Sequence, residues 1–286
     1  MNRLNPSQYC PANNALANVL VFDSGVGGLS ITQEIIARLP QVNITYAADN
    51  AAFPYGIMQE NNLIHRVDQI LHRFQEITRA DLIVVACNTA STIALPALRQ
   101  RFSVPIVGVV PAIKPAAKIS ESKVIGLLAT PGTVARQYTQ NLIDEFAGDC
   151  QVITLGSRLL VEMAEQKLSG VAVCPSALRE ELKPLLDANQ QQLLDTIVLA
   201  CTHFPLLKKE LTQCAPSIKH WVDSGEAIAR RVQNLLEDAG WSVNNGDNVA
   251  TPIYQTILTQ SPKNAQFLED FLHSWFSRSW SMLTVQ

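Results

Sequence analysis

The feature that most constrains the fold is an apolar segment that ends in cysteine and occurs twice in the chain. The first copy, DLIVVACNT, spans residues 81–89, and the second, DTIVLACTH, spans residues 195–203. Each is a short aliphatic and β-branched run followed by helix-compatible sequence, which is typical of a buried parallel strand. The repeat predicts two related α/β halves, each placing one thiol, Cys87 or Cys201, at the end of a strand.

The carboxyl ends of parallel strands are where open α/β sheets bind ligands, because helices begin there with free backbone N–H groups. A structural core cysteine is the alternative for each thiol, since free Cys is often buried. Four polar residues follow the two thiols directly: Asn88, Thr89, Thr202 and His203. These neighbours, and the duplication, favour a site.

The remaining pattern predicts the order of further elements. Strands are expected at residues 19–22, 43–47, 104–109, 124–129, 220–222 and 251–258, with one more after residue 150. Helices are expected over residues 29–39, 63–74, 88–102, 134–146, 226–239 and 263–276, with two amphipathic helices before residue 194.

We therefore expect two similar open parallel-sheet α/β domains, related by a pseudo-twofold axis, with the active site in the cleft between them. Residues 1–18 form an N-terminal extension that we expect to be poorly ordered and outside the fold. Residues 19–111 with 224–286 form the domain of Asp23 and Cys87, and residues 112–223 form that of Thr130 and Cys201.

Composition excludes several classes of protein. Of the 286 residues, 16% are charged and the net charge is -3, so no basic surface for nucleic acid is indicated. The chain has no apolar run of about 18 residues and no secretory signal pattern, so we expect a cytoplasmic protein without a membrane partner. Six cysteines without a C-x-x-C pair predict free thiols rather than disulfides or structural zinc.

A glycine-rich turn, DSGVGG at residues 23–28, follows the first predicted strand and could hold an anion at a helix N-terminus. One alternative is a dinucleotide fingerprint with Asp49 on the ribose. It is disfavoured, since Asp23 would face the pyrophosphate and Ser30 replaces the last glycine. Asp23 and Ser24 could otherwise be simple turn and cap residues.

Two thiols facing one cleft suggest an acid and a base on opposite faces of a small molecule. A thiol can exchange protons near neutral pH once a neighbour tunes it, and the candidate neighbours are Asp23 for Cys87 and His203 for Cys201. Thr130 and Thr133 could bind a carboxylate or form a helix cap. The two glutamates of the helix after residue 156, Glu162 and Glu165, are expected on a solvated surface.

Six segments, in order, resemble the successive signatures of the glutamate racemase family. They are VFDSGVGGL (21–29), FPYG (53–56), ACNTAS (86–91), ATPGT (129–133), CTHFPLL (201–207) and VDSG (222–225). The resemblance implies a cofactor-independent racemase of the aspartate/glutamate superfamily, without a metal, that supplies D-glutamate for peptidoglycan. Ala200, Phe204 and the pair Ile57-Met58 depart from the family pattern and affect only substrate-loop detail.

The resemblance also implies residue roles. Cys87 would deprotonate D-glutamate and Cys201 L-glutamate, assisted by Asp23 and His203. The substrate would be held by Asp23, Ser24, Tyr55, Gly56, Asn88, Thr89, Thr130, Thr133, Glu162, Thr202 and His203. The N-terminal extension resembles that of racemases that need a UDP-muramyl peptide-precursor activator, so activation of this kind is a further expectation.

Other classes of protein fit these residues less well than a racemase does. A pyridoxal enzyme needs a Schiff-base lysine, which neither cysteine segment offers, and a thiol hydrolase leaves one cysteine without a task. A racemase of another acidic amino acid such as aspartate stays open. So does a non-catalytic metal-binding module built on Cys87, Cys201 and His203, although their polar neighbours suit a closed four-ligand site poorly. The sequence leaves monomer and homodimer open.

Overall fold

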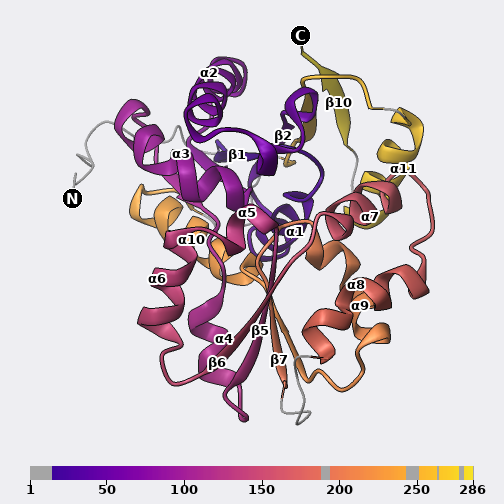
Figure 1. Ribbon diagram of the computed structural model, residues 1–286. Helices are drawn as coiled ribbons and strands as arrows, with labels where there is room; N and C mark the ends of the chain where they lie inside the picture. Colours follow the sequence, from indigo (N-terminus) through magenta and orange to yellow (C-terminus); the bar gives the residue numbers. More distant parts are fainter. Residues whose placement is uncertain (1–14, 188–193, 243–250, 263, 277–279, 286) are drawn as a thin grey trace.

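A computed structural model describes residues 15–187, 194–242, 251–262, 264–276 and 280–285. Within them the chain forms two sheets (Figure 1), in which every strand pair is parallel. The first sheet, in the order β10-β9-β2-β1-β3-β4, consists of β1 (Asn18–Asp23), β2 (Asn43–Ala48), β3 (Leu82–Val85), β4 (Ile106–Gly108), β9 (Tyr254–Leu258) and β10 (Ser281–Thr284). The second, in the order β6-β5-β7-β8, consists of β5 (Val124–Ala129), β6 (Gln151–Gly156), β7 (Thr196–Leu199) and β8 (His220–Val222).

The two sheets repeat one topology. The order β2-β1-β3-β4 in the first corresponds to β6-β5-β7-β8 in the second, so the two cysteine segments occupy equivalent strands, β3 and β7. Both of these strands are fully buried, as their aliphatic and β-branched sequences predict. The predicted fold class, two similar parallel-sheet α/β units, is confirmed.

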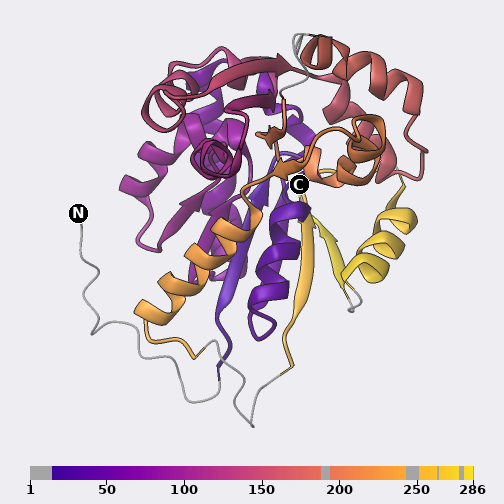
Figure 2. The same ribbon diagram turned by 90° about the horizontal axis from the view of Figure 1, so that it is seen from below.

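The helices flank these sheets. The first half and the C-terminal part contain α1 (Leu29–Arg38), α2 (Glu60–Thr78), α3 (Asn88–Arg101), α10 (Gly225–Asp238) and α11 (Ala265–Phe276). The second half contains α4 (Ile113–Ile119), α5 (Pro131–Val134), α6 (Gln137–Phe146), α7 (Leu159–Lys167), α8 (Pro175–Asp187) and α9 (Lys208–Cys214). Figure 2 shows α10 beside α1, so the chain returns to the first half after β8. Among the described residues, no helix has both the length and the apolar character needed to cross a bilayer.

Some predicted elements differ from the structure. The single helix expected over residues 134–146 is wrong, because Arg136 has extended backbone angles and separates α5 from α6. Helix α4 and strand β10 were not predicted; β10 comes from a tail without a clear pattern. The first strand begins at Asn18, whose backbone N–H donates to Asp81 Oδ2 at 2.8 Å.

The predicted disorder of the N-terminal extension lies, for residues 1–14, outside the described residues. Its last residues belong to the fold, since Ala17 is buried in the core. The domain boundaries near residues 111 and 223 stay a prediction: β1 to β4 precede the first, β5 to β8 lie between the two, and β9 and β10 follow the second.

Candidate active site

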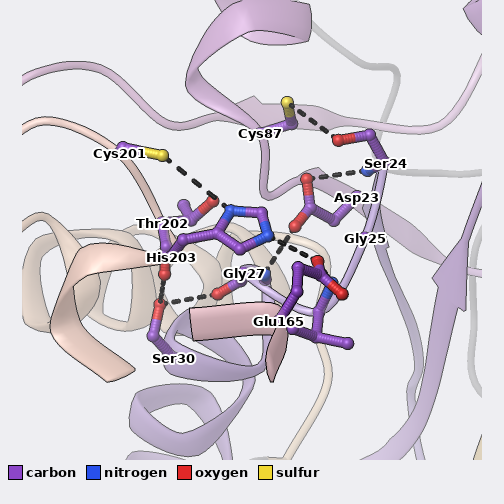
Figure 3. Close-up of polar contacts among 12 residues, drawn as sticks. Asp23, Ser24, Gly25, Gly27, Ser30, Cys87, Glu165, Cys201, Thr202 and His203 are labelled. Atoms are coloured by element: carbon purple, nitrogen blue, oxygen red, sulfur yellow. Dashed lines mark hydrogen bonds and ion pairs between the residues drawn. The ribbon is translucent and has the colours of Figure 1, made fainter. Parts of the chain in front are cut away.

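The carboxyl ends of four strands, two from each sheet, meet around one cavity of about 170 Å³. Strands β1 and β3 lead to Ser24 and Cys87, while β5 and β7 lead to Thr130 and Cys201. All four residues line the cavity, so both halves contribute to one site. Figure 3 shows Ser24, Cys87 and Cys201 with their polar contacts. The predicted juxtaposition of two thiols from equivalent strands is therefore present.

The first thiol, Cys87, is the N-cap residue of α3 and is buried, with Ser24 Oγ 3.9 Å from its Sγ. Asp23 lies fully buried beside it and accepts the backbone N–H groups of Ser24 and Gly28, both at 2.7 Å. Burial, and then the charge of Asp23, raise the pKa of Cys87 well above its usual range. Cys87 therefore holds its proton at neutral pH and is ready to act as an acid.

The second thiol, Cys201, has a different environment. Its Sγ is 3.8 Å from Nδ1 of His203, whose Nε2 is 2.7 Å from Glu165 Oε1. Burial lowers the pKa of His203, but the hydrogen bonds with Cys201 and Glu165 outweigh it and raise this pKa well above the ordinary histidine value. A basic imidazole this close to the sulfur can exchange a proton with the Cys201 thiol.

Most of the residues expected to hold substrate line this cavity. They are Ser24, Tyr55, Gly56, Asn88, Thr89, Thr130, Glu162, Thr202 and His203. The Oδ1 atom of Asn88 is buried and has no hydrogen-bond partner among the described residues, so it can accept a hydrogen bond from a bound ammonium group.

Tyr55 contributes its ring rather than a free hydroxyl, since its Oη donates to Asp49 Oδ2 at 2.7 Å. Asp49 also accepts two hydrogen bonds from Arg66, at 2.6 and 2.8 Å, and one from Thr259. The carboxylate that a dinucleotide site would use for the ribose is thus buried and already paired. This arrangement argues against the dinucleotide alternative.

Two expected residues do not line the cavity. Asp23 instead contacts two residues that line the cavity, Ser24 and Cys87. Burial raises the pKa of Asp23, against the opposing attraction of His203. Thr133 is fully buried, with its Oγ1 2.9 Å from Thr130 Oγ1, so it supports Thr130 as a partner in the helix cap.

Several lining residues were not predicted from the sequence. They are Phe53, Pro54, Ile57, Pro131, Arg158 and Val161. Glu165 was expected on a solvated surface, but its carboxylate bonds to His203 and to Val26 N. The one available signal was its spacing of three residues from Glu162, which places both on neighbouring positions of α7.

The two halves are also joined directly below the cavity. Ser30 Oγ donates to Thr202 O at 2.9 Å, and Gly27 leaves so little space that an added Cβ would lie 2.5 Å from His203 Nδ1. No group of three or more His, Cys, Asp or Glu side chains in the described ranges has an arrangement that could hold a metal ion.

Comparison with known proteins places these features in a family. The family model described as Asp/Glu/Hydantoin racemase matches residues 19–232. The glutamate racemase of Vibrio cholerae is 55% identical over 76% of this chain and 80% of its own length, and that of Photorhabdus laumondii is 53% identical over 78% and 77%. The structure of Escherichia coli glutamate racemase, in complex with L-glutamate and the activator UDP-MurNAc-Ala, superimposes with a TM-score of 0.86 at 45% identity, covering 95% of this chain and 98% of that one. With this match along the length of both sheets, and the paired thiols where they meet, the chain belongs to the Asp/Glu/hydantoin racemase family, among the glutamate racemases.

Proposed function

We propose that this chain interconverts L- and D-glutamate, with Cys87 and Cys201 as acid and base on opposite faces of the α-carbon. The observation that carries the proposal is the pair of buried thiols, one from each half, that line a single cavity. For L-glutamate, Cys201 removes the α-proton and Cys87 delivers a proton to the other face. For D-glutamate, the two thiols exchange these roles.

The environments of the thiols suit this division. Cys87 keeps its proton because of burial and Asp23, whereas His203 can take the proton of Cys201. The free enzyme is therefore prepared to accept L-glutamate. After one turnover toward D-glutamate, Cys201 holds a proton and Cys87 has lost one, so the thiols must re-equilibrate with solvent or with a reverse turnover.

The polar residues of the cavity would hold the substrate. Asn88 Oδ1 suits the ammonium group, because it is a buried acceptor with no partner among the described residues. Ser24, Thr89, Thr130 and Thr202 offer hydroxyl donors to the two carboxylates. No pyridoxal, flavin or metal has a role in this scheme, because the two thiols account for both proton transfers.

A labelling experiment tests the two-base scheme. In heavy water, early D-glutamate formed from L-glutamate should carry deuterium at the α-carbon, while the remaining L-glutamate stays protiated; the reverse reaction should mirror this. Mass spectrometry of the separated enantiomers measures it. Substantial early label in the recovered substrate from both directions would point to one shared base, and turnover of aspartate in place of glutamate would support the alternative substrate.

We further propose that a UDP-muramyl precursor activates this chain, as the E. coli relative was crystallised with such an activator. A second cavity, of about 850 Å³, lies between β4, α3 and α10 and is lined by Arg99 and Arg231. Its volume suits a nucleotide-sized ligand, and two guanidinium groups suit a diphosphate. We also propose that the D-glutamate supplies peptidoglycan synthesis and that the reaction takes place in the cytoplasm.

Racemisation measured with and without UDP-MurNAc-Ala tests this second proposal. We expect strong activation of the wild type and weak activation of Arg231→Ala, with Arg230→Ala, one position along the same helix, as the control. Equal wild-type activity with and without the precursor would contradict activation. Equal activation of Arg231→Ala and Arg230→Ala would contradict the location.

A further inference from the structure

Glu165 connects the two halves of the molecule at the imidazole of His203. Its Oε1 atom lies 2.7 Å from His203 Nε2 and accepts the backbone N–H of Val26 at 3.0 Å. Glu165 belongs to α7 of the second half, and Val26 to the glycine turn after β1 in the first half. Figure 3 shows the resulting chain of contacts from Glu165 through His203 to Cys201.

We propose that Glu165 is a positioning residue for the Cys201 half of the reaction, which holds His203 in the orientation that serves the sulfur. The inference rests on the proposed function. The opposite ring nitrogen, Nδ1, lies 3.8 Å from Cys201 Sγ, so carboxylate, imidazole and thiol stand in line. This is the order in which a carboxylate orients a base that activates a nucleophile or thiol.

The carboxylate determines which ring nitrogen carries the proton. Because Glu165 accepts from Nε2–H, neutral His203 presents its Nδ1 lone pair to Cys201. When Nδ1 takes the thiol proton, the nearby negative charge stabilises the imidazolium. The His203 side chain is 5% exposed and that of Glu165 is 28% exposed, so solvent screens the pair only in part.

The glycine turn is shaped to receive this carboxylate. A Cβ atom on Gly25 would collide with Glu165 Oε1, so the close approach needs glycine at that position. The hydrogen bond from Val26 then holds Oε1 independently of its bond to His203. Glu162, three residues earlier, instead faces the cavity itself. Glu165, which contacts His203 and does not line the cavity, is therefore the residue that positions the imidazole.

Two substitutions separate the effect of the negative charge of Glu165 from the effect of its hydrogen bond with Val26. Glu165→Gln keeps an oxygen that can accept from Val26 but removes the negative charge, and Glu165→Ala removes both. The control is Glu180→Gln, an exposed glutamate of α8. We expect kcat/KM to fall on the order of 10²-fold for Glu165→Gln. Because the equilibrium between enantiomers is one, this fall must be equal in both directions.

Isotope effects distinguish positioning of Cys201 from a general structural defect. With α-deuterated L-glutamate, the isotope effect on kcat/KM of Glu165→Gln should rise, because abstraction by Cys201 becomes more rate-limiting. With α-deuterated D-glutamate it should fall, because Cys87 abstracts that hydrogen. A structural defect would change both effects in the same direction or neither, and that result would overturn the proposal.

The activity of the wild-type protein shows whether a negative result contradicts the proposed function or only the role of Glu165. If wild-type protein does not racemise glutamate, the proposed function fails. If it does, and Glu165→Gln matches Glu180→Gln in rate and isotope effects, only the role of Glu165 fails. Circular dichroism and thermal unfolding verify that each variant is folded, and Glu165→Gln serves as the folded variant should Glu165→Ala not fold.

Discussion

Replacing Gly27 with alanine should disable the enzyme without unfolding it. An added Cβ would lie 2.5 Å from His203 Nδ1, 2.7 Å from Thr202 Oγ1 and 2.8 Å from His203 Cε1. Ordinary contacts of a Cβ begin near 3.4 Å. The imidazole must therefore move by about 1 Å, and a displacement of this size at a catalytic group costs about 10²-fold in rate, or about 2.7 kcal/mol.

The backbone at Gly27 should tolerate alanine, because among the described glycines only Gly170 and Gly240 have φ in the left-handed region. We therefore expect Gly27→Ala to be folded, with a stability loss of about 1–3 kcal/mol from overpacking. Steady-state racemisation measures kcat/KM, and thermal unfolding measures stability. Near-normal kcat/KM in a folded Gly27→Ala protein would refute the argument that the position of His203 limits the reaction.

Other substitutions and a pH profile test the roles of the two thiols and the stability of the fold. Cys87→Ala and Cys201→Ala should each abolish racemisation while circular dichroism stays native, because a site with one thiol cannot complete inversion; turnover in both directions by either variant would contradict the scheme. The pH profile of kcat/KM for L-glutamate should keep its alkaline limb above the ordinary thiol range, because Cys87 must be protonated to donate and its pKa is raised; an alkaline limb at or below that range would argue against Cys87 as the acid. Gly240→Ala, with φ of 84° and no atom within 4 Å of the added Cβ, should lose about 1 kcal/mol of stability with unchanged activity. Asp195→Asn should cost about 1–2 kcal/mol at pH 7 by urea unfolding, because it loses charge-assisted hydrogen bonds. Burial opposes the shift, but these bonds lower the pKa of Asp195 to about 2, so the difference from wild type should fade as pH falls from about 4 through 2, and a difference that persists there would contradict it.

The strand framework and the two thiols could be predicted because local sequence determines them. The runs before Cys87 and Cys201 are apolar without interruption, and such runs are stable only when both faces of the strand are covered. Residues 134–146, by contrast, do not form the single helix that was predicted. Periodicity there is helical on both sides of Arg136, but Arg136 reaches across to Thr92 Oγ1 in α3, a contact between distant segments that periodicity does not report.

The site was predictable where a residue follows within three positions of a strand's end, as Ser24, Asn88 and Thr202 do. Glu165 was not, because its role depends on the packing of α7 against a turn 139 residues earlier in the chain. Thr133 shows the converse: its sequence neighbourhood suggested ligand binding, but its hydroxyl is used by Thr130.

The duplicated fold makes the surroundings of the two thiols similar, whereas the proposed chemistry requires them to differ. Two equivalent halves put Cys87 and Cys201 at matching strand ends, and identical surroundings would give the two thiols the same affinity for a proton. The proposed mechanism needs one thiol protonated and the other deprotonated at the same moment. The halves therefore have to differ beside the sulfur, and they do: buried Asp23 raises the pKa of Cys87, whereas His203, supported by Glu165, can accept the proton of Cys201. In the proposed mechanism, symmetry places the two thiols, and the differences at Asp23, His203 and Glu165 make one thiol the acid and the other the base.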